Sequence, residues 1–187
     1  MASDEFAFRP LARRDFALLS EWFSAPHVKV WWAEETDAGS IEERYGPIVD
    51  GTDSSEVRII EREGQPLGLI QRYKLADNPA WQSTLSVTGT PNNAVGIDYL
   101  IGVERFIGRG LGPELIARFV SESWDQYPDI DAVVVSINET NRRSWRALEK
   151  VGFHRAWSGT LESDDPTDAG TNHVYVLYRP DSRVNGE

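Results

Sequence analysis

The segment Arg105-Phe106-Ile107-Gly108-Arg109-Gly110-Leu111-Gly112 decides the fold that we expect for this chain. It follows an apolar stretch, 94–103, that is typical of a strand, and it precedes a stretch whose apolar residues recur at helical spacing. Glycines permit a sharp turn and a close approach of the backbone to a ligand. The first N–H groups of a helix have no partner within the helix, and the helix dipole favours an anion there. The segment therefore predicts a phosphate site between a strand and a helix, with a purely structural glycine turn as the alternative.

Two other phosphate-binding motifs fit this segment less well. A P-loop needs a Lys followed by Ser or Thr, and the segment lacks that pair. A dinucleotide fingerprint should open a βαβ unit, whereas this turn comes late, after several expected strands and helices. Arg109 adds a positive charge beside the glycines. A pyrophosphate group is therefore the expected guest.

Hydrophobic periodicity on either side of the turn predicts the remaining elements. Strands are expected at 6–8, 57–61, 67–75, 94–103, 132–137, 153–161 and 173–179, and helices at 13–23, 41–49, 111–123 and 142–151. Ser40 and Glu43 are expected to form a capping box for the second helix, and Gly152 to end the fourth. The polar segment 76–93 is expected to be a long functional loop. The order predicts a mixed α/β, α+β-like single domain over 1–187, with a core at about 5–180 and a short flexible tail at 181–187.

Composition excludes several classes of protein. The 187 residues are 40% hydrophobic and contain no cysteine, which excludes a disulfide scaffold, a thiolate zinc site and a cysteine nucleophile. The three histidines are scattered, so no metal site is expected. A net charge of −11 disfavours nucleic acid and suits a polycationic small molecule, although the same charge also simply solubilises many proteins. No signal-peptide pattern or membrane-length apolar run appears, so we expect a cytoplasmic protein with no membrane partner.

Asp98 interrupts the apolar strand Val95-Gly96-Ile97-Asp98-Tyr99-Leu100-Ile101. An ionised carboxylate in such a strand costs several kcal/mol unless it is paired or faces a cleft. In a cleft, Asp98 would accept a proton from an ammonium substrate, directly or through water. The structural alternative is a strand-edge Asp that hydrogen-bonds to a loop.

Two motifs resemble the GNAT superfamily of N-acetyltransferases. Arg105-x-x-Gly108-x-Gly110 is similar to the family's acetyl-CoA pyrophosphate motif, and the stretch from Asn141 and Ser144 to Gly152-Phe153 is similar to its Asn-x-x-(Ser/Ala) helix. The resemblance implies a central, mostly antiparallel splayed sheet of about seven strands with about four helices, and acetyl-CoA as cosubstrate. It assigns cofactor contacts to Ile101, Val103, Gly108, Arg109, Gly110, Leu111, Gly112, Pro113, Asn141 and Ser144.

Gly96-Ile97-Asp98 further resembles the aminoglycoside 6′-N-acetyltransferases, and the likeness extends upstream through His27, Trp31-Trp32 and Glu34-Glu35. It implies that Asp98 deprotonates the amine, which attacks acetyl-CoA directly in a ternary complex, and that N–H groups around Ile101 hold the oxyanion. Carboxylates and aromatic faces suit a polyamine sugar. The implied substrate residues are Trp31, Trp32, Glu34, Asp53, Gln71, Tyr73, Trp81 and Asp98, and at least one of the two adjacent Trp residues is expected to plug the core.

Three departures from that family concern the substrate side. Leu148 stands where the family has a Tyr proposed as general acid, and Ser136 stands where it has an acidic residue. The segment 76–93 is longer than the family's loop and lacks its acidic run. The aminoglycoside acylated, and the position of its amine, stay open.

Four other functions are alternatives to 6′-amine acetylation. They are acylation of an aminoglycoside 2′-amine, acylation of a hydroxylysine-type siderophore precursor, acetylation of protein N-termini, and non-catalytic acyl-CoA binding. The siderophore enzymes usually carry His near the position of Asp98, and N-terminal acetylation needs an open groove. Retention of both Asp98 and the cofactor motif disfavours a non-catalytic protein. Either a monomer or a homodimer fits the sequence.

Overall fold

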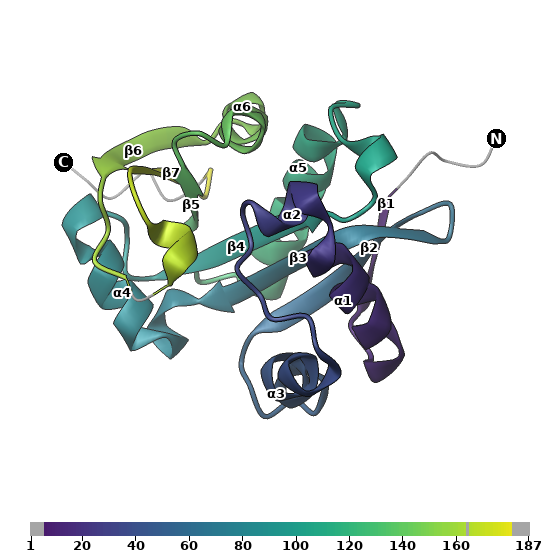
Figure 1. The fold of residues 1–187 in the computed structure, drawn as a ribbon. Helices are drawn as coiled ribbons and strands as arrows, with labels where there is room; N and C mark the ends of the chain where they lie inside the picture. The colour runs from purple at the N-terminus through teal and green to yellow at the C-terminus, as the bar shows by residue number, and fades with distance from the viewer. Residues whose placement is uncertain (1–5, 164, 181–187) are drawn as a thin grey trace. The chain divides into compact units, whose positions relative to one another are not determined.

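The computed structural model describes residues 6–163 and 165–180, so the predicted tail at 181–187 lies outside the described residues. Seven strands form one sheet in the order β1-β2-β3-β4-β5-β7-β6 (Figure 1). Their bounds are β1 Phe6–Pro10, β2 Glu56–Arg62, β3 Gln65–Lys74, β4 Ala94–Ile101, β5 Ala132–Asn138, β6 His154–Gly159 and β7 Asn172–Tyr178. The pairs β1–β2, β2–β3, β5–β7 and β6–β7 are antiparallel, and β4 pairs with β5 in parallel. This confirms the mostly antiparallel mixed α/β sheet.

Six α-helices occur in the described part of the chain, two more than the sequence predicts. They are α1 Phe16–Ser24, α2 Pro26–Lys29, α3 Ala38–Val49, α4 Pro79–Leu85, α5 Leu111–Gln126 and α6 Arg142–Val151. The two unpredicted helices, α2 and α4, are short, and each has a proline in its first turn. Proline suits that position because its missing N–H would have no helical partner there.

The chain forms two compact units. The first contains the described residues up to Arg72 together with Asp98–Arg109. The second contains Tyr73–Ile97 and the described residues from Gly110 onward. A single domain over 1–187 stays a prediction.

In the first unit, β1, β2 and β3 form an antiparallel ribbon whose apolar side chains pack against α1 and α3. A turn at Glu63-Gly64 joins β2 to β3, and both residues have a positive φ, 52° and 73°. Such a pair of left-handed residues matches the twist of a two-residue hairpin. The core of this unit includes Leu19, Trp22, Phe23, Ile41, Tyr45, Ile59 and Leu69.

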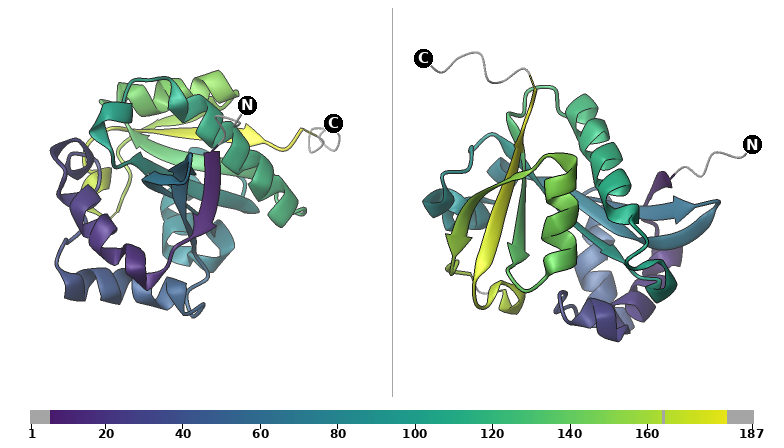
Figure 2. Two further views of the ribbon diagram at one scale, coloured as in Figure 1. Left: turned by 90° about the vertical axis from the view of Figure 1, so that its right-hand side faces the viewer. Right: turned by 90° about the horizontal axis from the view of Figure 1, so that it is seen from above.

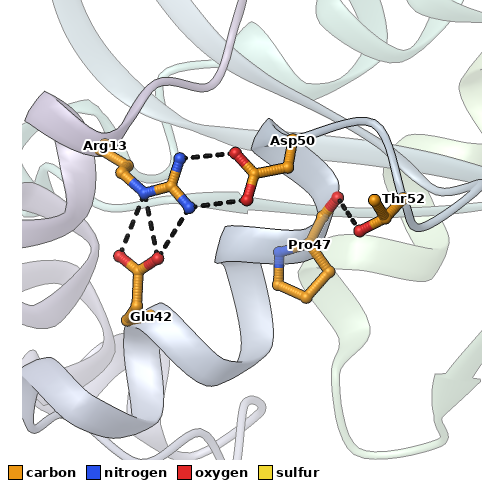
Figure 3. Close-up of polar contacts among 5 residues, drawn as sticks. All are labelled: Arg13, Glu42, Pro47, Asp50 and Thr52. Carbon is orange, nitrogen blue, oxygen red and sulfur yellow. Dashed lines mark hydrogen bonds and ion pairs between the residues drawn. The ribbon is translucent and has the colours of Figure 1, made fainter.

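Arg13 ties the start of α1 to α3 on the surface (Figure 3). Its guanidinium donates at 2.8 Å to Glu42, in the N-terminal half of α3, and at 2.7 Å to Asp50, the C-cap of α3. The carbonyl of Pro47, inside the last turn of α3, accepts hydrogen bonds from the Thr52 backbone N–H and hydroxyl at 2.9 and 3.2 Å. These contacts complete the end of α3 despite the proline within it.

In the second unit, β5 is buried on both faces, as its β-branched run predicts. Ala132 and Val134 contact the α4 side of the core with Leu85. Strand alternation turns Val133 and Val135 to the opposite face. β5 pairs with β4 in parallel at Ala94–Gly96 and with β7 in antiparallel register along its whole length.

Two expectations about local structure are wrong. The segment 76–93 is largely helical rather than a loop. Asn78 caps α4 by accepting a hydrogen bond from the Trp81 N–H at 3.4 Å, and the side chain of Leu85 at the end of the helix is buried. The helix expected at 41–49 begins at Ala38, because Asp37 rather than Ser40 is its N-cap. The Asp37 carboxylate accepts from the N–H groups of Gly39 and Ser40, so the proposed capping box with Ser40 does not form.

Candidate active site

Asp98 lies on β4 and is held by Gln71 of β3 within the first unit. Gln71 Nε2 donates to Asp98 Oδ2 at 2.9 Å, and Gln71 is 8% exposed. A hydrogen bond to an ionised acceptor is stronger than one between neutral groups, so this contact fixes the orientation of the carboxylate. The structural alternative, an Asp held by a loop, does not describe this contact, because its partner is a strand residue.

A second carboxylate of the first unit, Glu34, accepts a hydrogen bond from a buried phenol. Tyr45 of α3 is 0% exposed, and its hydroxyl donates to Glu34 Oε1 at 3.4 Å. Burial raises the pKa of Tyr45 far above its usual value, and the charges of Glu34 and Asp98 raise it further. Arg44 Nε lies 3.9 Å from Glu34. Burial therefore keeps Tyr45 a neutral phenol that donates to Glu34.

His27 of α2 contacts the end of β4. Its Nε2 lies 3.1 Å from the carbonyl oxygen of Ile101, so the Nε2–H tautomer donates to that carbonyl. On the other side, β3 approaches β4 closely, because a methyl group on Gly68 would overlap the carbonyl of Leu100. The Gly102 N–H donates to the Leu67 carbonyl at 2.8 Å. The strand end predicted to hold the oxyanion is thus fixed from two directions.

The paired tryptophans divide their roles. Trp32 packs on the core and stacks on Phe23 with ring centroids 5.7 Å apart, which confirms that one of the pair plugs the core. Trp31 is half-buried. Asp53, predicted to bind substrate, accepts from the Ser55 N–H at 2.7 Å, and this bond lowers the pKa of the carboxyl. Asp53 thus already has a local structural role.

The glycine turn has the predicted geometry. Gly108 and Gly110 have φ values of 75° and 79°, a region in which side chains are strained. Arg109 is exposed, and its Nε donates to the Arg105 carbonyl at 3.0 Å. Gly110 is the N-cap of α5 and supplies no side-chain cap. The first N–H groups of α5 are therefore left for a ligand, as a pyrophosphate requires.

The start of α5 packs on α6 in the second unit. A methyl group on Gly112 would lie 3.3 Å from the Cβ of Ala147, so glycine permits this close approach. Asn141, predicted to contact the cofactor, is the N-cap of α6 and accepts from the Ser144 N–H at 3.3 Å. Leu148 is 0% exposed, so the position of the family's phenol is filled by a core side chain.

An open cavity of about 550 Å³ lies beside α4 in the second unit. Trp81 lines it together with two exposed carboxylates of the β6–β7 connection, Glu162 and Asp165. Tyr73, the other aromatic residue predicted to bind substrate here, packs with Trp81 on the same core cluster. Carboxylates beside an aromatic face suit an ammonium-bearing ring.

Ser136 of β5 carries a buried hydroxyl oxygen that has no hydrogen-bond partner in the described part of the chain. A buried polar atom without a partner costs free energy. No group of three or more histidines and carboxylates that suits a metal occurs among residues 6–163 and 165–180. None of the described helices is long and apolar enough to cross a membrane.

The sequence matches a known family model over most of its length. The model of the acetyltransferase (GNAT) domain covers residues 12–161 of this chain. The chain belongs to the GNAT acetyltransferase family. This GNAT chain is also 28% identical, over 168 residues, to two enzymes named aminoglycoside N(6′)-acetyltransferase type 1, from Klebsiella pneumoniae and Serratia marcescens. The matched region spans 88% of this chain and 80% of each relative.

Solved structures of aminoglycoside acetyltransferases are also similar to this chain. The aminoglycoside acetyltransferase AAC(6′)-Ib in complex with coenzyme A has a TM-score of 0.78 and 26% identity to this GNAT chain, covering 94% of it and 95% of the other. A structure of AAC(6′)-Ib with ribostamycin and coenzyme A has a TM-score of 0.79 and 26% identity, covering 98% and 99%. A spermidine N-acetyltransferase chimera from Vibrio cholerae and hSSAT, at 13% identity and a TM-score of 0.67, shares the fold. The predicted family, fold and acetyl-CoA-dependent class of enzyme are confirmed.

Sequence reasoning did not select three residues that border these candidate sites. Tyr45 looked like an ordinary apolar position of a helix, and only packing places its hydroxyl 3.4 Å from Glu34. Glu162 and Asp165 belong to the acidic run at 162–165, between the strands predicted at 153–161 and 173–179, and no function is predicted for that run from the sequence. The density of carboxylates in that run was the available signal.

Proposed function

We propose that this GNAT enzyme transfers the acetyl group of acetyl-CoA to a primary amine of an aminoglycoside, with the 6′-amine of a kanamycin-type compound as the acceptor. One observation carries the choice of acceptor. Gln71 orients the Asp98 carboxylate through a 2.9 Å hydrogen bond, and the same unit holds a second carboxylate, Glu34, which accepts from the Tyr45 hydroxyl. Carboxylates held in this unit favour a cationic amine over a neutral or anionic acceptor.

Asp98 acts as the general base in this proposal. The ammonium group of the substrate loses a proton to the Asp98 carboxylate, directly or through one water molecule, while Gln71 donates to Oδ2. Gln71 is thus a positioning residue rather than a direct substrate contact. Glu34 keeps the acceptor oriented by its charge, and Tyr45 offers a hydroxyl that remains protonated.

The neutral amine then attacks the thioester carbonyl of acetyl-CoA. A C–N bond forms, the C–S bond breaks, and coenzyme A leaves as a thiolate that takes up a proton from solvent, because Leu148 offers none. Backbone N–H groups at the end of β4 stabilise the developing oxyanion, and His27 fixes that strand end through the Ile101 carbonyl. No covalent enzyme intermediate is needed.

Acetyl-CoA suits the anion site on the glycine turn. Gly108 and Gly110 adopt positive φ angles that glycine tolerates, and the start of α5 carries no side-chain cap. We propose contacts from Ile101, Val103, Gly108, Arg109, Gly110, Leu111, Gly112, Pro113, Asn141 and Ser144. Trp31 is proposed to contact another ring of the aminoglycoside. Within the second unit, the carboxylates of Glu162 and Asp165 beside Trp81 are proposed to bind an ammonium group in place of the acidic residue that Ser136 replaces.

A thiol-release assay tests the proposal. The acceptors are kanamycin-type aminoglycosides, matched aminoglycosides with a hydroxyl in place of the 6′-amine, N-hydroxylysine derivatives and peptides. Release is expected with the 6′-amino compounds alone. Release only with lysine derivatives or peptides would overturn the acceptor, and release with none of them despite measured coenzyme A binding would overturn the activity.

The Asp98→Asn variant tests the base. Its turnover should fall by about 10²–10⁴-fold, the usual contribution of a general base, while coenzyme A affinity is unchanged. Asp50→Asn makes the same chemical change at an exposed carboxylate that pairs with Arg13, and it should leave turnover unchanged. Equal turnover in Asp98→Asn and wild type would remove Asp98 from the mechanism.

We further propose that the enzyme works in the cytoplasm as a monomer or homodimer, without a nucleic-acid partner. A net charge of −11 repels nucleic acid. The absence of cysteine suits a reducing compartment.

A further inference from the structure

Gly96 is a buried glycine inside β4 whose backbone conformation does not require glycine. It pairs with Val134 of β5 in the regular parallel register, and it is not among the glycines of the described chain that have a positive φ. A glycine inside a strand weakens it, because glycine has no side chain to pack and loses more freedom on folding. The reason for glycine at this position must therefore lie in what approaches it.

The hydroxyl end of the Tyr73 ring fills the space that a side chain at position 96 would occupy. A methyl group on Gly96 would lie 2.4 Å from Cε2 and Cζ of Tyr73 and 2.7 Å from its hydroxyl oxygen. These distances are far shorter than the roughly 3.5–4.0 Å of a normal contact between carbon atoms. Gly96 therefore allows the far end of the Tyr73 ring to lie directly against the backbone of β4.

The Tyr73 ring lies at the border of the core of the second unit. Tyr73 is half-buried and packs, together with Trp81, against the core cluster that contains Ala94. Ala94 is two residues before Gly96, so strand alternation places both on one face of β4, in agreement with the position of the ring. Trp81 lines the cavity beside α4. The ring held by Gly96 thus belongs to the same aromatic cluster as the proposed ammonium site.

We propose that Gly96 is a positioning residue for acceptor recognition: its missing side chain holds the Tyr73 ring against β4, where the ring contacts a sugar ring of the acceptor. This inference rests on the proposed function, which makes the acceptor an aminoglycoside. An aromatic ring whose orientation is already fixed binds a ligand without a further loss of conformational entropy. Gly96 itself does not touch the acceptor and acts through Tyr73.

The atoms that an added methyl group displaces decide whether a glycine substitution affects folding or recognition. At Gly68 the methyl group would overlap the backbone carbonyl of Leu100. At Gly96 it would overlap the end of a half-buried side chain, which can turn away about its χ angles. Gly96→Ala should therefore keep the fold and move the Tyr73 ring out of its position.

Gly159 supplies a matched control in the same unit. It is also a strand glycine beneath an aromatic ring, because a methyl group on it would lie 2.6 Å from the ring of Trp157. Gly159 ends β6, the edge strand of the sheet, which Figure 2 (right) shows beyond the yellow strand β7. Since β5 and β7 separate β6 from β4, three strand spacings put the two strands about 14 Å apart. Gly159→Ala repeats the chemical change without displacing Tyr73.

Steady-state kinetics of thiol release with kanamycin, on the full chain, test the inference. Gly96→Ala should raise the KM for kanamycin by about fivefold to tenfold, the size of one aromatic contact, while kcat and the KM for acetyl-CoA change by less than about twofold. Tyr73→Leu should have the same effect. The double variant should be no worse than Tyr73→Leu alone, because the methyl group then displaces nothing. Gly159→Ala should keep the wild-type values.

The outcomes separate this inference from the proposed function. An unchanged KM for kanamycin in Gly96→Ala would overturn the inference, and so would additive losses in the double variant or an equal rise in Gly159→Ala. If Gly96→Ala does not fold, the double variant should fold, because the overlap with the ring is gone; failure of both to fold would also overturn it. Absence of turnover of kanamycin by wild type would instead contradict the proposed function.

Discussion

The side-chain amide of Gln71 donates a 2.9 Å hydrogen bond to Oδ2 of Asp98, joining β3 to the acidic residue of β4. Gln71 is buried, so the bond is shielded from competing water. One carboxylate oxygen is thereby occupied and the plane of the group is fixed. A base held in this way presents its remaining lone pairs in one direction, which is the geometric requirement for proton transfer from a bound amine.

Replacement of Gln71 by Ala should lower kcat by about tenfold, the size of a hydrogen bond to a charged group, with a smaller change in KM. The pH–rate profile should change as well, because Gln71 no longer donates to the carboxylate that takes the proton. Gln65→Ala, at an exposed position of the same strand, is the control. A Gln71→Ala profile that coincides with that of Gln65→Ala would rule out the positioning role.

Glu34→Gln should raise KM for aminoglycosides by about 10-fold with a small change in kcat, because it removes a charge that attracts the ammonium but not the base. Tyr45→Phe keeps the ring that stacks on Phe23, 5.9 Å between centroids, and removes the hydroxyl. It should raise KM less than Glu34→Gln does and leave the melting temperature nearly unchanged. Steady-state kinetics with Glu35→Gln, an exposed neighbour, provides the comparison. A fall in kcat at constant KM for Glu34→Gln would contradict substrate binding.

Gly68→Ala should destabilise the protein by about 3 kcal/mol or more, because the added methyl group would overlap the backbone carbonyl of Leu100, which has no room to yield. Urea denaturation measures the effect. Ser54→Ala, an exposed substitution in the same unit, should change the free energy of unfolding by less than about 0.5 kcal/mol. Equal denaturation midpoints for the two variants would show that β3 and β4 are not in close contact at Gly68.

His173 should make stability fall in acid. It is 8% exposed, and burial, aided by the nearby Arg155 guanidinium, lowers the pKa of the ring. Arg155 Nη1 lies 3.4 Å from Nε2, and the Ser158 hydroxyl lies 2.9 Å from Nδ1. The pKa in the folded state is below that of the unfolded chain, so the unfolded state binds the proton better. Stability is therefore full above the unfolded pKa of about 6.5 and declines as the pH falls below it.

Thermal melts between pH 8 and pH 5.5 test this expectation. The decline should be smaller in His173→Asn, which removes the titrating ring, although that variant should be less stable at pH 8. His154→Asn removes an exposed histidine and should keep the wild-type slope. A His173→Asn slope equal to that of wild type would assign the acid sensitivity to other groups.

The sequence by itself determined the family and most of the sheet. The glycine turn needs residues that tolerate positive φ, and this requirement is visible in Gly108 and Gly110 without any structure. The β-branched run of β5 and the bounds of α6, Arg142–Val151, were likewise local properties. The short helices α2 and α4 escaped prediction because capping and packing, rather than periodicity, stabilise them.

Only the tertiary structure decided how the chemically active side chains are grouped. Asp98 is 27 residues from Gln71, and no local pattern predicts their hydrogen bond. The contact of Tyr45 with Glu34 and the close approach of Gly112 to Ala147 likewise depend on how helices pack. Local sequence encodes backbone preferences and capping, whereas the pairing of distant polar groups is set by the strand register and helix packing that burial of the core imposes.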